Sequence, residues 1–298
     1  MPQPANAVHV EEHLIKRAVP IVGEGSLSAL SGSHDGSTAV TGISMVNAAP
    51  SSLGERIQRG TSLVTLSGLI HKEESEYLVQ LSQAAASSQK RAKSNNCTLD
   101  QEMQVCVVRM PTMAAAQREM GLGHDSDGLS ETLSLYLEEM LERALLFIDT
   151  QLCPSVKDTF LGGGEPNTAS SKDQNFSLVQ LFRDNRLEYS RKEPAVNVYD
   201  APNGQFSIHT DNKALTILIP LSDPDLDFTG GGTAFWSESS PIIEAEQPPS
   251  LVLMPPAGTA LLFGGTLSHK GFPIHTGTRV VFVASFSPLS KAPPATST

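Results

Sequence analysis

The chain has 298 residues, of which 39% are hydrophobic and 18% charged, and this length and composition suit one large domain. Its formal net charge of −11 argues against non-specific binding to nucleic acid or to anionic lipid. No apolar run is long enough for a membrane span, no signal peptide is visible, and the three cysteines form no CxxC motif, so we expect a cytoplasmic protein with reduced thiols.

The first 57 residues are rich in Ala, Ser, Gly and polar residues, as in GEGSLSALSGSHDGSTAVTG, and offer few side chains for a core. We therefore expect a flexible N-terminal arm over residues 1–57. His9 and His13 lie four positions apart within it, where a solvated pair is expected rather than a metal site. The domain is predicted to cover residues 58–290, followed by a flexible tail over residues 291–298.

Helices are predicted in the first half of this domain. The segment TSLVTLSGLI (61–70) predicts a strand, and KEESEYLVQLSQAAASS (72–88) predicts the helix after it. A clearer helix is GLSETLSLYLEEMLERALLFIDTQL (128–152), whose apolar residues recur at three- and four-residue steps and predict core packing. Residues 154–193 are expected to be irregular, either as a lid or substrate loop or as a disordered segment.

From Pro194 onward, short apolar segments alternate with Gly, Pro, Asp and Asn, a pattern typical of a β-sandwich or barrel. Because the helices precede the strands instead of alternating with them, we expect an α+β fold with helices on one face of a largely antiparallel, double-sheet β-core. Three consecutive glycines at 230–232 predict a tight turn, since no helix with Lys-Ser/Thr follows them as in a phosphate loop. The predicted strands are AVNVY, QFSIHTD, ALTILIPL, GTAFW, SLVLM, TALLF and RVVFVASF.

The segment FSIHTDN (206–212) contains two residues of metal-ligand type. Side chains alternate between the faces of a strand, so His209 and Asp211 point one way while Phe206 and Ile208 point the other. His-x-Asp alone supports two interpretations: part of a metal site, or a hydrogen-bonded histidine beside a turn-capping aspartate.

Further residues downstream favour the metal site. His269 lies in LSHKGFPIHTGTR, and Arg279 ends that segment immediately before the last apolar strand. Two histidines and one carboxylate form the facial triad of non-haem Fe(II) oxygenases. The motifs YDAPNGQFSIHTD, GGGTAFW, PPAGTALLF and HKGFPIHTGTR, in this order, resemble the Fe(II)/2-oxoglutarate-dependent dioxygenase superfamily in its prolyl 4-hydroxylase-like branch. The resemblance implies a double-stranded β-helix (jelly-roll or cupin-like) core at about 194–288, with the N-terminal helices packed on one sheet.

Residue by residue, the resemblance implies that His209, Asp211 and His269 bind the catalytic iron. It also implies that Arg279 binds the distal carboxylate of 2-oxoglutarate through its planar fork. The positive charges of Fe(II) and Arg279 would then balance the negative charges of Asp211 and of the two co-substrate carboxylates. A buried site with uncompensated charge would be costly. The implied cofactors are Fe(II), 2-oxoglutarate and O₂, with ascorbate as an optional reductant.

Other positions match the family less closely. Tyr199, ten residues before His209, matches a tyrosine that lines the co-substrate pocket, although packing on the core is the alternative. Thr216 matches a threonine whose hydroxyl reaches the distal carboxylate. Pro220 stands near the place of a tyrosine in many prolyl hydroxylases, which predicts a strand end or edge and different co-substrate contacts. His275 competes with His269 as third ligand but lies outside the family pattern and is expected to be a solvated loop residue.

Three functions follow as hypotheses. The first is hydroxylation of a C–H bond, of a prolyl residue in a peptide or protein, where the choice of proline depends on the resemblance alone. The second is hydroxylation of a free amino acid or other small metabolite, favoured because no peptide-binding domain is recognisable. The third is a catalytically silent metal-binding or scaffolding β-barrel. The expected partners are a peptide, protein or small-molecule substrate, and neither nucleic acid nor a membrane.

Overall fold

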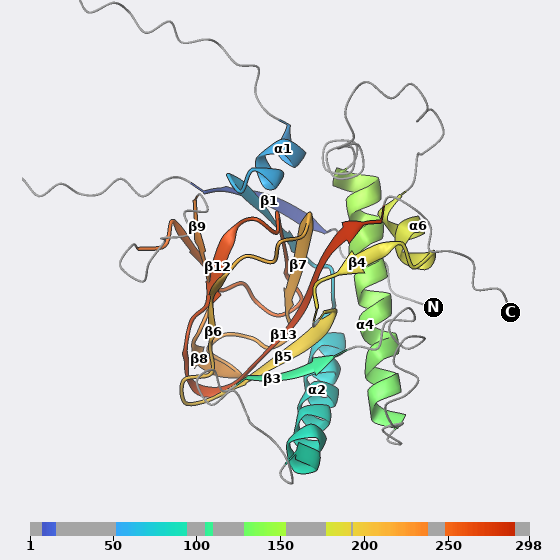
Figure 1. Cartoon of the computed structure of the whole chain (residues 1–298). Coiled ribbons are helices and arrows are strands. Elements are labelled where there is room, and N and C mark those ends of the chain that lie inside the picture. Colours follow the sequence, from blue (N-terminus) through green and yellow to red (C-terminus); the bar gives the residue numbers. More distant parts are fainter. Residues whose placement is uncertain are drawn as a thin grey trace, which may run out of the picture.

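The computed structural model describes residues 8–15, 52–93, 105–109, 128–152, 177–191, 193–237 and 248–289. Two antiparallel sheets form its centre (Figure 1). The larger sheet has the path β1-β2-β11-β7-β13-β5-β3, with β4 and β8 also paired to β13. Its strands are β1 (His9–Leu14), β2 (Ser62–Ser67), β3 (Val105–Arg109), β4 (Leu187–Tyr189), β5 (Ala195–Asp200), β7 (Leu215–Pro220), β8 (Phe228–Gly230), β11 (Ala260–Phe263) and β13 (Ile274–Pro288).

The smaller sheet has the order β10-β9-β12-β6. Its strands are β6 (Phe206–His209), β9 (Thr233–Trp236), β10 (Leu251–Leu253) and β12 (Ser268–Gly271). From β5 to β13 the chain passes back and forth between the two sheets, so that β5 lies beside β13 and β6 lies beside β12. This order is the expected double-stranded β-helix, with two facing sheets rather than one closed barrel.

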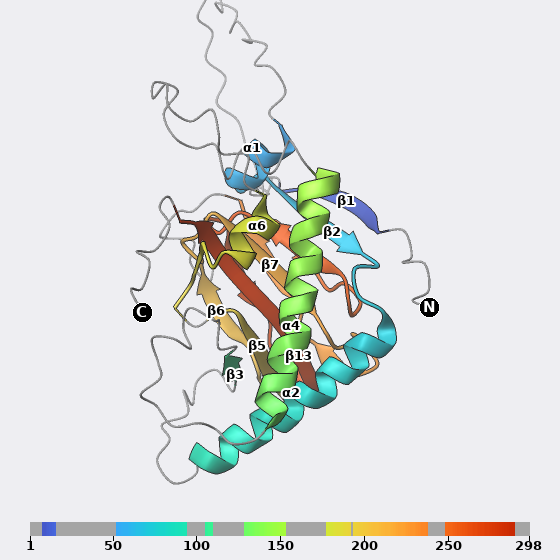
Figure 2. The ribbon, with the colours of Figure 1, turned by 90° about the vertical axis from the view of Figure 1, so that its right-hand side faces the viewer.

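The helices cover the outer face of the larger sheet, as predicted. Helices α2 and α4 lie across that face in Figure 2, and both stand to one side of the sheets in Figure 1. Helix α4 continues into a π-helical turn, η1, and the short helix α6 packs beside it. The helices are α1 (Leu53–Gln58), α2 (Lys72–Lys93), α4 (Gly128–Phe147), η1 (Ile148–Leu152) and α6 (Leu178–Arg183). None of the helices in these described ranges is long and apolar enough to cross a membrane.

Strand β13 shows how alternation builds two cores from one strand. Val280 and Phe282 belong to the core between the larger sheet and the helices. Val281 belongs to a second core between the two sheets, together with Leu218 and Phe263. Because successive side chains face opposite ways, a strand buried on both faces has an uninterrupted apolar sequence, as VVFVASF does. The side chains that face the second core also face the candidate site.

The prediction of a flexible arm over residues 1–57 is wrong for the described parts of that range. Strand β1 pairs with β2 along its whole length, and the following Ile15 is 4% exposed. Helix α1 begins after a capping box formed by Ser52 and Glu55. The sequence HVEEHL is mostly polar because β1 is an edge strand, held by backbone hydrogen bonds that composition does not reveal. The other residues of the arm, and the tail at 291–298, lie outside the described residues.

Two further expectations need correction. His13 is not solvated, because its Nε2 lies 3.0 Å from the Thr65 hydroxyl on β2. The region 154–193 is not irregular throughout, since α6 and β4 lie within it. The carboxylate of Asp149 accepts hydrogen bonds from the first two backbone N–H groups of α6, at 2.9 Å each. Ser177 is the local N-cap and accepts from the Gln180 N–H, while Asp149 adds two contacts from a distant part of the sequence.

Candidate metal centre

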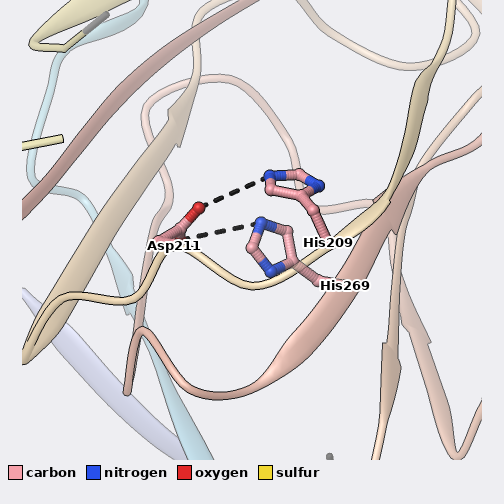
Figure 3. Close-up of side chains that lie close together, drawn as sticks. All are labelled: His209, Asp211 and His269. Atoms are coloured by element: carbon pink, nitrogen blue, oxygen red, sulfur yellow. Dashed lines mark ion pairs between the residues drawn. The ribbon is translucent and has the colours of Figure 1, made fainter. Parts of the chain in front are cut away.

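Two neighbouring strands of the smaller sheet bring the predicted ligands together. His209 ends β6, and His269 on β12 is its register partner. The two imidazole centroids are 4.3 Å apart. Asp211 follows β6 by two residues, and its backbone N–H donates to the carbonyl of Gly265, 2.8 Å away, in the loop before β12. In Figure 3 the two imidazoles and the carboxylate face one another. Among the described residues, these three are the one group of His, Cys, Asp or Glu side chains whose potential ligand atoms all lie within 4.8 Å of one another.

The histidine tautomers suit a metal. Nδ1 of His209 lies 2.7 Å from the carbonyl oxygen of Ser207, and Nδ1 of His269 lies 3.0 Å from that of Leu267. A carbonyl can only accept, so each Nδ1 donates, and in the neutral form of each ring the lone pair is on Nε2, as metal binding requires. The Nε2 atoms face Asp211, at 3.4 Å from Oδ1 for His209 and 3.8 Å from Oδ2 for His269. Two imidazole lone pairs and a carboxylate therefore converge, as the donor set of a non-haem iron site requires.

Burial and mutual contacts determine the charge of these groups. Burial lowers the pKa of His269, so this imidazole is held neutral, the form that binds metals. Burial would likewise lower the pKa of His209, but the hydrogen bond and charge of Asp211 outweigh it and raise that pKa. Burial would raise the pKa of Asp211, but its contacts with the two histidines and Thr216 outweigh burial and lower it. Asp211 is thus an ionised carboxylate at neutral pH.

Thr216 supports Asp211 from behind and does not have the position expected for a co-substrate contact. Its hydroxyl donates to Asp211 Oδ2 at 2.6 Å and lies 3.1 Å from the Ser285 hydroxyl. Thr216 pairs with Ser285 on β13, six positions from Arg279, which is roughly 20 Å along a strand. The hydroxyl is therefore too far from Arg279 to share a carboxylate with it, and it orients the carboxylate of Asp211 instead.

Arg279 lies at the other end of the same pocket, 4% exposed. Its guanidinium donates to the Gly232 carbonyl at 3.1 Å and to the Thr233 hydroxyl at 3.0 Å, and it lies 5.5 Å from the centre of the Tyr199 ring. Burial lowers its pKa. These partners are neutral, and none of the ion pairs between described residues involves Arg279. A buried cation with neutral partners fits a site for a carboxylate ligand.

Tyr199 and Leu218 also line the pocket, and Tyr199 lies beside Arg279 as its register partner. Tyr199 is buried, and burial raises the pKa of its phenol, so it stays protonated. Pro220 is the last residue of β7 and lies inside the sheet, between β11 and β13, so it marks a strand end and not an edge. His275 is exposed, lies within β13 and does not line the pocket.

Thr233 and Glu193 are among the pocket residues that sequence reasoning missed. Thr233 directly follows the glycine turn, where Gly230, Gly231 and Gly232 all have positive φ and bend the chain so that this hydroxyl meets Arg279. Glu193 lies just before β5, and its carboxylate faces the pocket near the triad. The signal for Thr233 was its place in GGGTAFW, whereas nothing local distinguishes Glu193 from a surface glutamate.

No family model matches the chain, and no curated protein matches it either. The solved structures that it matches, at TM-scores below 0.5, include prolyl hydroxylases and a 2OG-Fe(II) oxygenase family protein from Burkholderia pseudomallei. The dioxygenase for auxin oxidation from rice is 14% identical, with a TM-score of 0.46 over 81% of this chain and 80% of that one. A Trichoplax adhaerens prolyl hydroxylase, in complex with a hypoxia inducible factor oxygen degradation domain peptide fragment, is 12% identical, with a TM-score of 0.44 over 78% and 86%.

A Pseudomonas putida prolyl-4-hydroxylase is also 12% identical, with a TM-score of 0.38 over 78% of this chain and 95% of that one. Likenesses at these values concern the fold and carry no information about substrate.

Proposed function

We propose that this protein is an Fe(II)- and 2-oxoglutarate-dependent oxygenase that hydroxylates a C–H bond. One observation carries the proposal: a two-histidine, one-carboxylate triad and a buried arginine occupy opposite ends of one pocket. The triad offers three ligands and leaves the remaining coordination positions open. Bound iron would supply the oxidising chemistry, together with 2-oxoglutarate and O₂.

The residues of the chain have separate roles in this proposal. Nε2 of His209, Nε2 of His269 and a carboxylate oxygen of Asp211 would hold the metal. The guanidinium of Arg279 would hold the distal carboxylate of 2-oxoglutarate, and it is already oriented by Gly232 and Thr233.

The walls and the open side of the pocket divide the site between co-substrate and substrate. Leu218 and Val281 line the wall and exclude water from the co-substrate. The His209 side chain is 34% exposed, against 6% for His269, so the site opens to solvent on the His209 side. We propose that the substrate enters there.

Two substrate classes are proposed for this reaction. A prolyl residue in a peptide or protein is supported by the resemblance of the motifs to the prolyl 4-hydroxylase-like branch. A free amino acid or small metabolite is supported by Glu193, a carboxylate beside the triad. The competing proposal of a different class is a silent metal-binding scaffold with this fold.

Anaerobic addition of Fe(II) and then 2-oxoglutarate to the metal-free protein tests the proposal. We expect a visible charge-transfer band from the metal–co-substrate chelate in the wild type, and no band in His269→Ala. His275→Ala is the matched control, because it removes an exposed histidine outside the pocket and is expected to keep the band. Absence of the band in folded, metal-loaded wild type would favour the silent scaffold.

A further inference from the structure

Glu193 is an acidic residue in the pocket that the proposed mechanism does not use. It lies just before β5, opposite Ser285 of β13, and its Oε2 accepts a hydrogen bond from the Ser285 backbone N–H at 2.5 Å. Its side chain lines the same pocket as His209 and Asp211. The contact with Ser285 fixes the carboxylate in place.

Strand pairing places Glu193 at the metal end of the pocket. Arg279 pairs with Tyr199 on β5, and Val283 pairs with Ala195, so Glu193 and Arg279 lie near opposite ends of the β5–β13 ladder. Ser285, which bonds Glu193, also contacts the hydroxyl of Thr216 that supports Asp211. If Arg279 holds the distal carboxylate of 2-oxoglutarate, the co-substrate would occupy the Arg279 end of the pocket. Glu193, at the end of the triad, would then remain available to a substrate.

The charges indicate what kind of group belongs next to Glu193. The metal, Asp211, 2-oxoglutarate and Arg279 balance one another, so an ionised Glu193 adds one uncompensated negative charge. None of the ion pairs between described residues includes it. A buried carboxylate without a partner cation is costly, and a cation supplied from outside the chain would remove that cost.

We propose that Glu193 binds a positively charged amine of the substrate and so selects amino-acid-like molecules that carry an ammonium group. The proposal rests on the proposed function, because it assigns the substrate side of that same site. The amine has two sources with the same chemistry: the α-ammonium of a free amino acid, and the side-chain ammonium of a lysine-like residue. In either case the ammonium donates to the Glu193 carboxylate while the carbon chain extends toward the metal.

Anaerobic calorimetry tests this on the full chain loaded with Fe(II) and 2-oxoglutarate, where no turnover occurs. The probes form two pairs that differ in one ammonium charge. L-proline against N-acetyl-L-proline tests the α-ammonium, and Nα-acetyl-L-lysinamide against Nα-acetyl-L-norleucinamide tests the side-chain ammonium. We expect the charged member of one pair to bind about tenfold tighter or more, as for a hydrogen bond to a charged group.

The variant Glu193→Gln is expected to lose that preference, since its amide oxygen still accepts from Ser285 but its charge is gone. Glu193→Asp keeps the charge and is expected to retain part of the preference. Glu188→Gln is the matched control, because Glu188 is exposed on β4, lies outside the pocket and pairs with Lys213.

Each outcome bears on one of the two proposals. The substrate-class proposal is overturned if neither charged probe exceeds its neutral partner in the wild type, or if folded Glu193→Gln keeps the full preference. The charge-transfer band of the same samples reports the proposed function separately. A band without a charge preference leaves the oxygenase proposal standing and removes only the role of Glu193.

Discussion

Replacing Thr216 by valine removes a side-chain hydroxyl that supports the carboxylate of Asp211. The side chain is fully buried, and its hydroxyl donates to Asp211 Oδ2 at 2.6 Å. Valine has nearly the same shape, so the substitution leaves the carboxylate oxygen without this donor and without a water to replace it. The orientation of Asp211 and its low pKa both depend partly on this contact.

The size of the effect follows from the type of bond. A hydrogen bond to a charged group contributes about 1.5–3 kcal/mol, equivalent to roughly 10- to 150-fold in an equilibrium constant. Outer-shell substitutions at metal sites typically cost about 10–100-fold in affinity. We therefore expect Thr216→Val to bind Fe(II) about 10–100-fold more weakly, while Thr216→Ser keeps the hydroxyl and stays within a few-fold of the wild type.

The assay is an anaerobic competition titration of Fe(II) between the protein and a chromophoric chelator. Circular dichroism and a denaturant titration of each metal-free variant show whether the fold is kept. Wild-type affinity in a folded Thr216→Val protein would refute the support of Asp211 by Thr216. Equal weakening in the valine and serine variants would point to loss of packing instead of loss of the hydrogen bond.

Three further predictions concern the rest of the pocket and the N-terminal strand. Arg279→Lys keeps the positive charge but loses the planar fork of the guanidinium. We expect the affinity for 2-oxoglutarate to fall about tenfold or more, with the affinity for Fe(II) unchanged. Equal 2-oxoglutarate affinity of variant and wild type in an anaerobic titration would contradict this. The pKa of Glu193 is raised from 4.5 to about 7, so the folded metal-free wild type holds a proton that the unfolded chain releases, and its stability falls as pH rises through that window. Glu193→Gln should therefore gain up to about 3 kcal/mol over the wild type between pH 4.5 and 8 in denaturant unfolding, whereas a pH-independent difference would count against burial as the cause. Deleting residues 1–15 removes buried Ile15 and uncovers the edge of β2. We expect the free energy of unfolding to fall by about 1.5–3 kcal/mol and aggregation to increase, while Fe(II) affinity is retained. An unchanged unfolding midpoint would contradict this prediction.

Regular patterns in the sequence were sufficient for the two long helices, α2 and α4, and for most of the β-core. The three- and four-residue spacing from 128 to 152 predicted α4, and the apolar segments after Pro194 correspond to strands of the two sheets. Thr216 and Leu218, two positions apart on β7, lie on the same face of that strand. Alternation does not reveal the register between neighbouring strands. In the observed register Thr216 pairs with Ser285, six positions along β13 from Arg279.

Contacts between residues distant in sequence account for what was missed. Strand β1 is polar and is ordered by backbone pairing with β2, and α6 begins at a carboxylate supplied by Asp149. Glu193 is held by the backbone of Ser285, which lies 92 residues later. None of these contacts leaves a periodic signal, so a single sequence without its fold does not indicate them.

The position of β13 determines when the metal centre can be completed during synthesis. This strand pairs with β4, β5, β7 and β8, all of which leave the ribosome before it. It also carries Arg279 and Ser285, which contact the two ends of the pocket. A nascent chain that ends before residue 274 has the three side chains of the proposed metal site but lacks the strand that joins their supports. We therefore expect iron to be acquired after translation of this segment, by a chain whose sheet has already formed around the empty pocket.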